Sequence, residues 1–157
     1  MEKRYYIAYG SNLNIRQMLR RCPGARVLGT ASLTGWELLF KGSRTGSYLT
    51  IEECGDGMVP VVVWEVTASD EAALDRYEGF PNFYYKRDIQ LKYKGIRTGK
   101  HRTVTAFAYI MHEDRLVGVP SNFYMRTCLD GYNTFRFNKN ILIDAYNKCW
   151  EVCGYEE

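Results

Sequence analysis

The sequence has only two histidines, His101 and His112, among its 157 residues. Their spacing from each other and from the cysteines matches neither a zinc site nor a Ser-His or Cys-His nucleophile. The glycine-rich patterns that cradle nucleotide phosphates, G-x-G-x-x-G and G-x-x-x-x-G-K-S/T, are also missing. We therefore expect neither a metal nor a cofactor, and chemistry that needs only a positioned carboxylate, hydroxyl groups and backbone donors.

Long apolar runs are missing too, since no segment approaches the roughly 18 to 20 apolar residues that cross a bilayer. The first apolar run, Tyr5–Tyr9, is too short and too aromatic for the core of a signal peptide. We therefore expect a cytoplasmic protein with no membrane partner.

A disulfide framework is not expected, because the five cysteines are odd in number and scattered. Cys149 and Cys153 lie four apart beside Trp150, but neither a C-x-x-C pair nor a histidine stands near them. We expect reduced thiols that serve in packing, at Cys22, Cys54, Cys128, Cys149 and Cys153.

A strong charge of one sign is also lacking, because the formal net charge of +3 is below the balance typical of a nucleic-acid-binding domain. The densest basic stretch, residues 92–102, is interrupted by Gly95 and Gly99 and is typical of a solvated hairpin end. We expect no nucleic-acid partner. Binding of RNA or single-stranded DNA through the tyrosines and this hairpin is an open alternative, which predicts an affinity that depends strongly on salt.

The composition is that of an ordinary globular protein, with 46% apolar and 25% charged residues. A chain of this length buries roughly two thirds of its unfolded surface around one core. Because no repeat, linker or low-complexity tract divides the sequence, we expect a single domain over residues 1–157.

The first part of the sequence predicts a strand, a helix and a curled sheet. The strand is Arg4–Tyr9, and the helix after it should have Asn12 or Asn14 as its N-cap and end at Cys22-Pro23-Gly24. Pro60–Trp64 is apolar throughout, which predicts a central strand covered on both faces. The short extended runs that form the sheet are Val27–Leu33, Trp36–Phe40, Tyr48–Ile51 and Val59–Val66.

The rest of the sequence completes an α+β pattern. Ser69 is the expected N-cap of the next helix, and Gly79 with Pro81 should end it. The expected elements are a helix from Ser69 to Tyr77, strands over Phe83–Tyr93 and Arg102–Met111, and two helices between Ser121 and about Cys153.

The loop after the first strand, Tyr9-Gly10-Ser11-Asn12, is the first candidate site. Gly10 lacks the Cβ that would keep a ligand away from the backbone. The amides after it lie at the start of the predicted helix, where free N–H groups and the helix dipole attract a carboxylate or a phosphate. A glycine after a strand also forms ordinary turns, so this pattern alone is not specific.

Glu78 is the second candidate. It falls at the end of the predicted helix, where the negative pole of the dipole disfavours a carboxylate and should raise its pKa. If Tyr77, Phe80 and Pro81 also exclude water, the pKa rises further, toward that of a general base near neutral pH. From this segment alone, a solvated or ion-paired glutamate is the simpler interpretation.

Several segments of the sequence resemble the gamma-glutamylcyclotransferase-like proteins, and together they span most of the chain to about Tyr132. They are Tyr5–Leu13, Val61–Val66, Leu74–Gly79 followed by Tyr84-Tyr85, Phe107–Met111 and Pro120–Tyr124. The sequence after Tyr132 shows no feature of the family. The resemblance implies a compact mixed β-barrel with flanking helices, and a pocket in which the loop faces the glutamate at the end of the helix.

The resemblance also implies an activity, the release of 5-oxoproline from a gamma-glutamyl compound whose α-amine attacks its own γ-carbonyl. By this match Glu78 is the acid/base catalyst, and the residues expected to bind substrate are Tyr9, Gly10, Ser11, Asn12, Leu13, Tyr85 and Tyr109. Tyr84 is an alternative to Tyr85, because the two are adjacent. The expected partner is a small gamma-glutamyl amino acid or amine. The resemblance does not specify the identity of the leaving amine. A module that binds a carboxylated metabolite without turnover is the alternative function.

Overall fold

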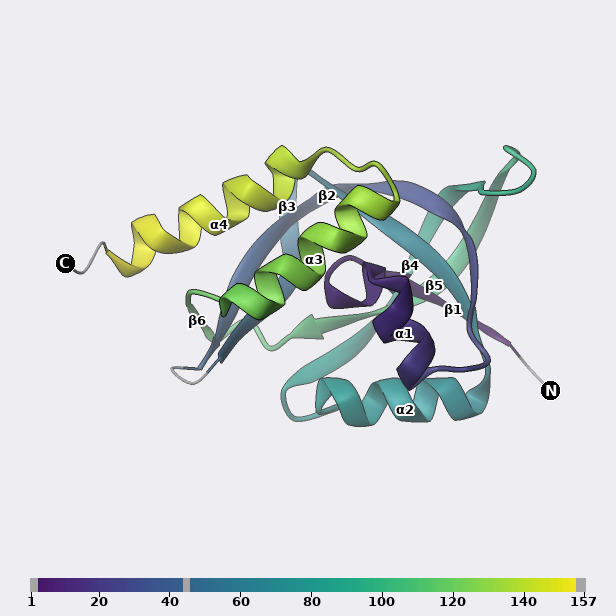
Figure 1. The fold of residues 1–157 in the computed structure, drawn as a ribbon, viewed down its shortest axis with the longest axis horizontal. Helices are drawn as coiled ribbons and strands as arrows, with labels where there is room; N and C mark the ends of the chain where they lie inside the picture. The colour runs from purple at the N-terminus through teal and green to yellow at the C-terminus, as the bar shows by residue number, and fades with distance from the viewer. Residues whose placement is uncertain (1–2, 44–45, 155–157) are drawn as a thin grey trace.

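The computed structural model describes residues 3–43 and 46–154, and its centre is a ring of five strands (Figure 1). The strands are β1 (Arg4–Ala8), β2 (Arg26–Ser43), β3 (Gly46–Val66), β4 (Tyr84–Gly95) and β5 (His101–Met111). They pair in the order β3-β1-β5-β4-β2, and β2 pairs with β3 to close the ring. Because β1 and β5 are parallel and the other pairs antiparallel, the predicted mixed β-barrel is confirmed.

The longest part of the barrel is the β2–β3 hairpin, which runs from the pair Arg26 and Glu65 to the pair Ser43 and Gly46. The sequence predicted four short strands here, and this is wrong because the glycine and polar clusters lie inside continuous strands. One of them, Gly35, has a φ of 84° at an irregularity of the ladder. The central strand was predicted correctly, since Val61–Val63 are fully buried and β3 pairs with both β1 and β2.

Helices flank the barrel, as predicted for the α+β fold. They are the one-turn 3₁₀ helix η1 (Ser11–Leu13), α1 (Ile15–Arg21), α2 (Ala68–Glu78), α3 (Asn122–Thr134) and α4 (Lys139–Cys153). In Figure 1, α1 lies beside α2, and α3 lies next to the turn η1; α4 packs against β2. Within residues 3–43 and 46–154, none of these helices has the length and apolar character needed to cross a membrane.

The helix ends follow local side-chain chemistry. Asn14, one of the two predicted caps, accepts a hydrogen bond from the amide of Gln17 at 3.1 Å. The cap of α2 is Thr67 rather than the predicted Ser69, because Thr67 and Asp70 bond to each other's amides in a capping box. Gly79 ends α2, as predicted, and the structure shows that its backbone is in the left-handed conformation.

Close packing of α3 fixes the loop after β1. A Cβ added at Gly131 in α3 would lie 2.5 Å from the Cβ of Leu13 and 2.9 Å from its carbonyl carbon. A real side chain cannot come this close, so only glycine lets the helix backbone rest on η1. The loop that contains the first candidate site is therefore held from behind by α3.

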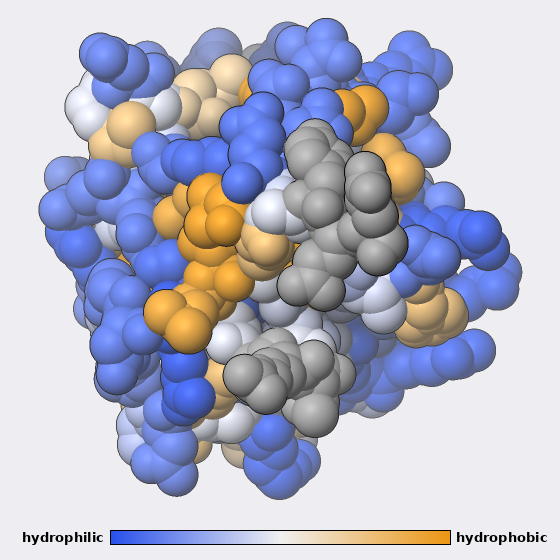
Figure 2. Space-filling view, turned by 90° about the vertical axis from the view of Figure 1, so that its left-hand side faces the viewer, coloured by the Kyte–Doolittle hydropathy of each residue, from blue (hydrophilic) through white to orange (hydrophobic). Residues whose placement is uncertain are grey.

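Apolar side chains also reach the surface. Figure 2 shows them gathered in a short band among polar residues, on the side of the molecule where β6 (Leu116–Val117) and the end of α4 lie. Among the exposed apolar residues, Leu116 is 78% and Val152 59% accessible. The end of α4 therefore contributes little to the barrel core.

Candidate active site

A cavity of about 290 Å³ opens between the barrel and the helices on one side. It is lined mainly by aromatic side chains, with Glu78 as the only acidic residue among them. The lining residues are Tyr6, Tyr9, Gly10, Ser11, Asn12, Tyr48, Leu49, Tyr77, Glu78, Phe83, Tyr84, Tyr109 and Tyr124. The structure thus brings both candidate segments, far apart in sequence, to one cavity.

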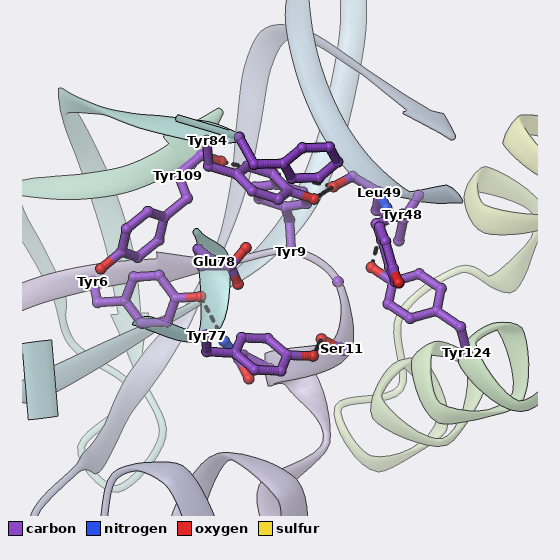
Figure 3. Close-up of a pocket in the computed structure, with 13 residues that line it drawn as sticks. Tyr6, Tyr9, Ser11, Tyr48, Leu49, Tyr77, Glu78, Tyr84, Tyr109 and Tyr124 are labelled. Carbon is purple, nitrogen blue, oxygen red and sulfur yellow. Dashed lines mark hydrogen bonds between the residues drawn. The ribbon is translucent and has the colours of Figure 1, made fainter. Parts of the chain in front are cut away.

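Glu78 is the last residue of α2, and the left-handed Gly79 turns the chain away directly after it. Figure 3 shows the carboxylate of Glu78 pointing into the cavity, between Tyr9 and Tyr84 on one side and Tyr6 and Tyr77 on the other. No hydrogen bond or ion pair to this carboxylate is formed by any residue in the described part of the chain. The group is therefore enclosed but chemically available to a ligand.

Burial raises the pKa of Glu78 from 4.5 to about 8, and the positive charge of Arg21 opposes this shift. The predicted upward direction is confirmed, although the first cause is removal of water by the cavity walls rather than the helix dipole. Burial also raises the pKa of the hydroxyls of Tyr6, Tyr9 and Tyr84 above their usual range, so these groups stay protonated. Glu78 is thus a proton acceptor poised near neutral pH inside a set of neutral hydroxyls.

The predicted substrate loop lines the cavity from Tyr9 to Asn12. The hydroxyl of Tyr9 donates to the carbonyl of Tyr109 at 2.7 Å, and Asn12 Nδ2 donates to the hydroxyl of Tyr6 at 2.9 Å. Ser11 Oγ lies 3.2 Å from the hydroxyl of Tyr77, the neighbour of Glu78. The loop and the end of α2 therefore share hydrogen bonds as well as a cavity.

Two expectations about this loop are corrected by the structure. The amides of Gly10 to Asn12 do not begin an α-helix, because η1 is a single turn and α1 starts only at Ile15. The Leu13 side chain is fully buried in the core and does not line the cavity.

Gly10 lines the cavity and is also closely packed by neighbouring residues. A Cβ there would lie 3.3 Å from the hydroxyl of Tyr124 and 3.4 Å from the side chain of Leu49. The missing side chain therefore makes room for the cavity wall itself.

The two adjacent tyrosines of β4 point in opposite directions, because side chains alternate along a strand. Tyr85 was predicted to line the pocket, and this is wrong: its hydroxyl donates to Glu113 on the outside of the barrel. Its alternative, Tyr84, lines the cavity and donates to the carbonyl of Leu49 at 2.8 Å. Tyr109 lines the cavity with its ring, while its hydroxyl donates to Asp75 Oδ1 at 2.6 Å.

Comparison with known proteins adds an independent observation. The family model described as "Gamma-glutamyl cyclotransferase, AIG2-like" matches residues 6–126. The chain belongs to this family. The matched segment contains every residue that lines the cavity of this family member.

Solved structures show the same fold. A gamma-glutamyl cyclotransferase is 26% identical, with a TM-score of 0.71 over 94% of this chain and 86% of its own. An uncharacterized human protein is also 26% identical, with a TM-score of 0.71 over 95% of this chain and 87% of its own. YkqA from Bacillus subtilis shares the fold at 18% identity, with a TM-score of 0.72 over 94% of this chain and 55% of its own. No curated protein matches.

Several lining residues of this gamma-glutamyl cyclotransferase family member were not predicted from the sequence. They are Tyr6, Tyr48, Leu49, Tyr77, Phe83 and Tyr124. Three of them carried a usable signal, since Tyr6, Tyr77 and Tyr124 each lie in a segment of the resemblance. In the structure the hydroxyl of Tyr124 accepts a hydrogen bond from the amide of Leu49 at 3.0 Å.

Proposed function

We propose that the protein is a gamma-glutamyl cyclotransferase that releases 5-oxoproline from a gamma-glutamyl amino acid or amine, with Glu78 as the acid/base. The observation that carries the proposal is an isolated carboxylate with a pKa near 8, enclosed in a cavity beside the Tyr9–Asn12 loop. Membership of the family supports the same reaction class.

In the proposed reaction the substrate supplies its own nucleophile. A bond forms between the α-nitrogen and the γ-carbonyl carbon, and the bond from that carbon to the leaving nitrogen breaks. Because the two reacting groups belong to one molecule, holding them in the right geometry replaces much of the entropic cost of the reaction. Glu78 accepts a proton from the α-nitrogen and delivers one to the departing nitrogen.

The cavity walls suit the charges of such a substrate. Aromatic faces around one carboxylate attract an ammonium group, which places the α-amine next to Glu78. We assign the α-carboxylate, or the developing oxyanion, to the backbone amides of Gly10, Ser11 and Asn12. The hydroxyl of Tyr84 replaces that of Tyr85 as the group that orients the glutamyl chain.

A substrate panel tests the proposal directly. The protein is incubated with gamma-glutamyl amino acids and gamma-glutamyl amines, and 5-oxoproline is measured. We expect product from at least one member of the panel. Absence of product with folded protein would overturn the proposal, and saturable binding by calorimetry in that case would favour a binding module.

The outer half of the cavity predicts where the leaving group lies. Tyr48 is 40% exposed at the mouth, with its ring 5.2 Å from that of Tyr124 and 6.3 Å from that of Phe83, both edge to face. Glu78 lies at the other side of the cavity (Figure 3). With the glutamyl group beside Glu78, the leaving group meets these three rings.

We therefore expect Tyr48→Ala to lower kcat/KM for a gamma-glutamyl compound with an aromatic leaving group by about five- to tenfold, the size of one aromatic contact. The value for gamma-glutamylalanine should change little, because its leaving group is too small to cover the ring. Tyr48→Phe keeps the ring and serves as the control. Equal losses for both substrates in Tyr48→Ala would place the leaving group elsewhere.

A further inference from the structure

Arg21, the last residue of α1, connects the substrate loop to the helix that ends at Glu78. Its Nη1 donates to Asn12 Oδ1 in the loop, and its Nη2 donates to Gln17 Oε1 at 2.9 Å. Its guanidinium carbon lies 3.5 Å from the centre of the Tyr77 ring, on the residue before Glu78. One planar cation is therefore held on three sides, by the loop, by its own helix and by α2.

The groups that Arg21 binds are themselves tied to the cavity. Asn12 uses its Nδ2 to donate to Tyr6, and Tyr77 shares a hydrogen bond with Ser11. These contacts close a ring of interactions from Arg21 through Asn12 and Ser11 to Tyr77 and back. Only a planar group with several donors can stack on a ring and bond to two amide oxygens at once, so lysine would not replace arginine here.

The positive charge of Arg21 has no carboxylate partner, because none of the ion pairs within residues 3–43 and 46–154 includes it. The other titratable groups that face Glu78 are neutral hydroxyls from β1, the loop after it, α2, β4, β5 and α3, namely Tyr6, Tyr9, Tyr77, Tyr84, Tyr109 and Tyr124. Arg21 is thus the cation that acts on the Glu78 carboxylate, and it does so without an ion pair between them.

We propose that Arg21 is a positioning residue that fixes the substrate loop against the end of α2 and supplies the positive charge beside Glu78. It acts through Asn12 and Tyr77 on the geometry of the site, and through its field on the ionisation of Glu78. A cation favours the charged form of a nearby carboxylate, so loss of Arg21 makes Glu78 harder to ionise. The catalytic consequence rests on the proposed function, whereas the effect on ionisation does not.

The test compares Arg21→Gln and Arg21→Lys with Arg20→Gln, a control one residue earlier on the exposed side of α1. Ionisation of Glu78 is followed by ¹³C NMR of labelled glutamate carboxylates, and the signal is assigned by its loss in Glu78→Gln. We expect the pKa of Glu78 to rise in Arg21→Gln, to rise less in Arg21→Lys, and to stay at the wild-type value in Arg20→Gln. Because Arg21→Lys keeps the charge, it provides the measurement if the glutamine variant does not fold.

The same variants are then assayed with a substrate from the panel across pH. The acid limb of kcat/KM should move to higher pH in parallel with the NMR titration, and a displacement of one pH unit lowers kcat/KM at pH 7 about tenfold. An unchanged titration of Glu78 in folded Arg21→Gln would overturn the inference. If the wild type turns over no substrate, the proposed function fails while the NMR result still decides the role of the Arg21 charge.

Discussion

Glu78→Gln is expected to abolish most turnover, with kcat lower by about 10²- to 10⁴-fold, the usual contribution of a positioned acid/base. Glutamine has nearly the shape of glutamate but cannot accept a proton from the α-nitrogen or return one to the leaving group. The aromatic walls and the loop remain in place, so substrate binding should be retained in large part. Formation of 5-oxoproline gives the rate, and calorimetry gives the dissociation constant.

The matched control is Glu53→Gln, the same chemical change on β3. The side chain of Glu53 is 65% exposed and pairs with Arg87 at the surface, so its loss should leave kcat at the wild-type value. Wild-type turnover by folded Glu78→Gln would remove Glu78 from the chemistry. A rate loss of the same size in both variants would indicate a general electrostatic effect instead.

The sequence predicted the contiguous parts of the site well. The loop from Tyr9 to Asn12 and the helix end at Glu78 are each formed by a few neighbouring residues, and both line one cavity, as the resemblance implied. Lining residues such as Tyr48 and Tyr124 were missed because closure of the barrel and packing of α3 bring them to the cavity. Such contacts depend on the tertiary fold rather than on local pattern.

The choice between Tyr84 and Tyr85 shows a second limit of prediction from the sequence. A shift of one residue exchanges the two faces of a strand, and β4 carries apolar or aromatic residues on both faces at this point. The pairing of Tyr84 with Met111 and of Tyr85 with Ile110 sets the register, and only the folded barrel shows which face is inside. The long β2 and β3 strands were divided in the prediction for a related reason, because their exposed glycine and polar positions have the composition of loops.

A second large effect should appear in stability, again at Glu78. The folded protein holds the pKa of this group near 8, whereas an unfolded chain restores the ordinary value of 4.5. Between these two values the native state keeps a proton that the unfolded state releases, so the free energy of unfolding falls as pH rises. Below pH 4.5 both states are protonated, so Glu78 causes no loss of stability. Above pH 8 both states are ionised, and this penalty on the free energy of unfolding reaches at most about 5 kcal/mol.

Glu78→Gln cannot ionise, so it should escape this penalty and gain stability over the wild type as pH increases. Denaturant unfolding at pH 5, 7.5 and 9 measures the difference, which we expect to grow by about 3 kcal/mol between pH 5 and 7.5. The free energy of unfolding of Glu53→Gln should instead change with pH in the same way as that of the wild type. Parallel curves for Glu78→Gln would mean that Glu78 titrates normally in the folded protein, and that the cavity does not prepare it as a base.

The stability measurement needs no substrate, so it tests the poised carboxylate independently of the reaction that we assign to it. A variant that is more stable at alkaline pH and inactive would show that the chain retains a destabilising carboxylate because the reaction requires it.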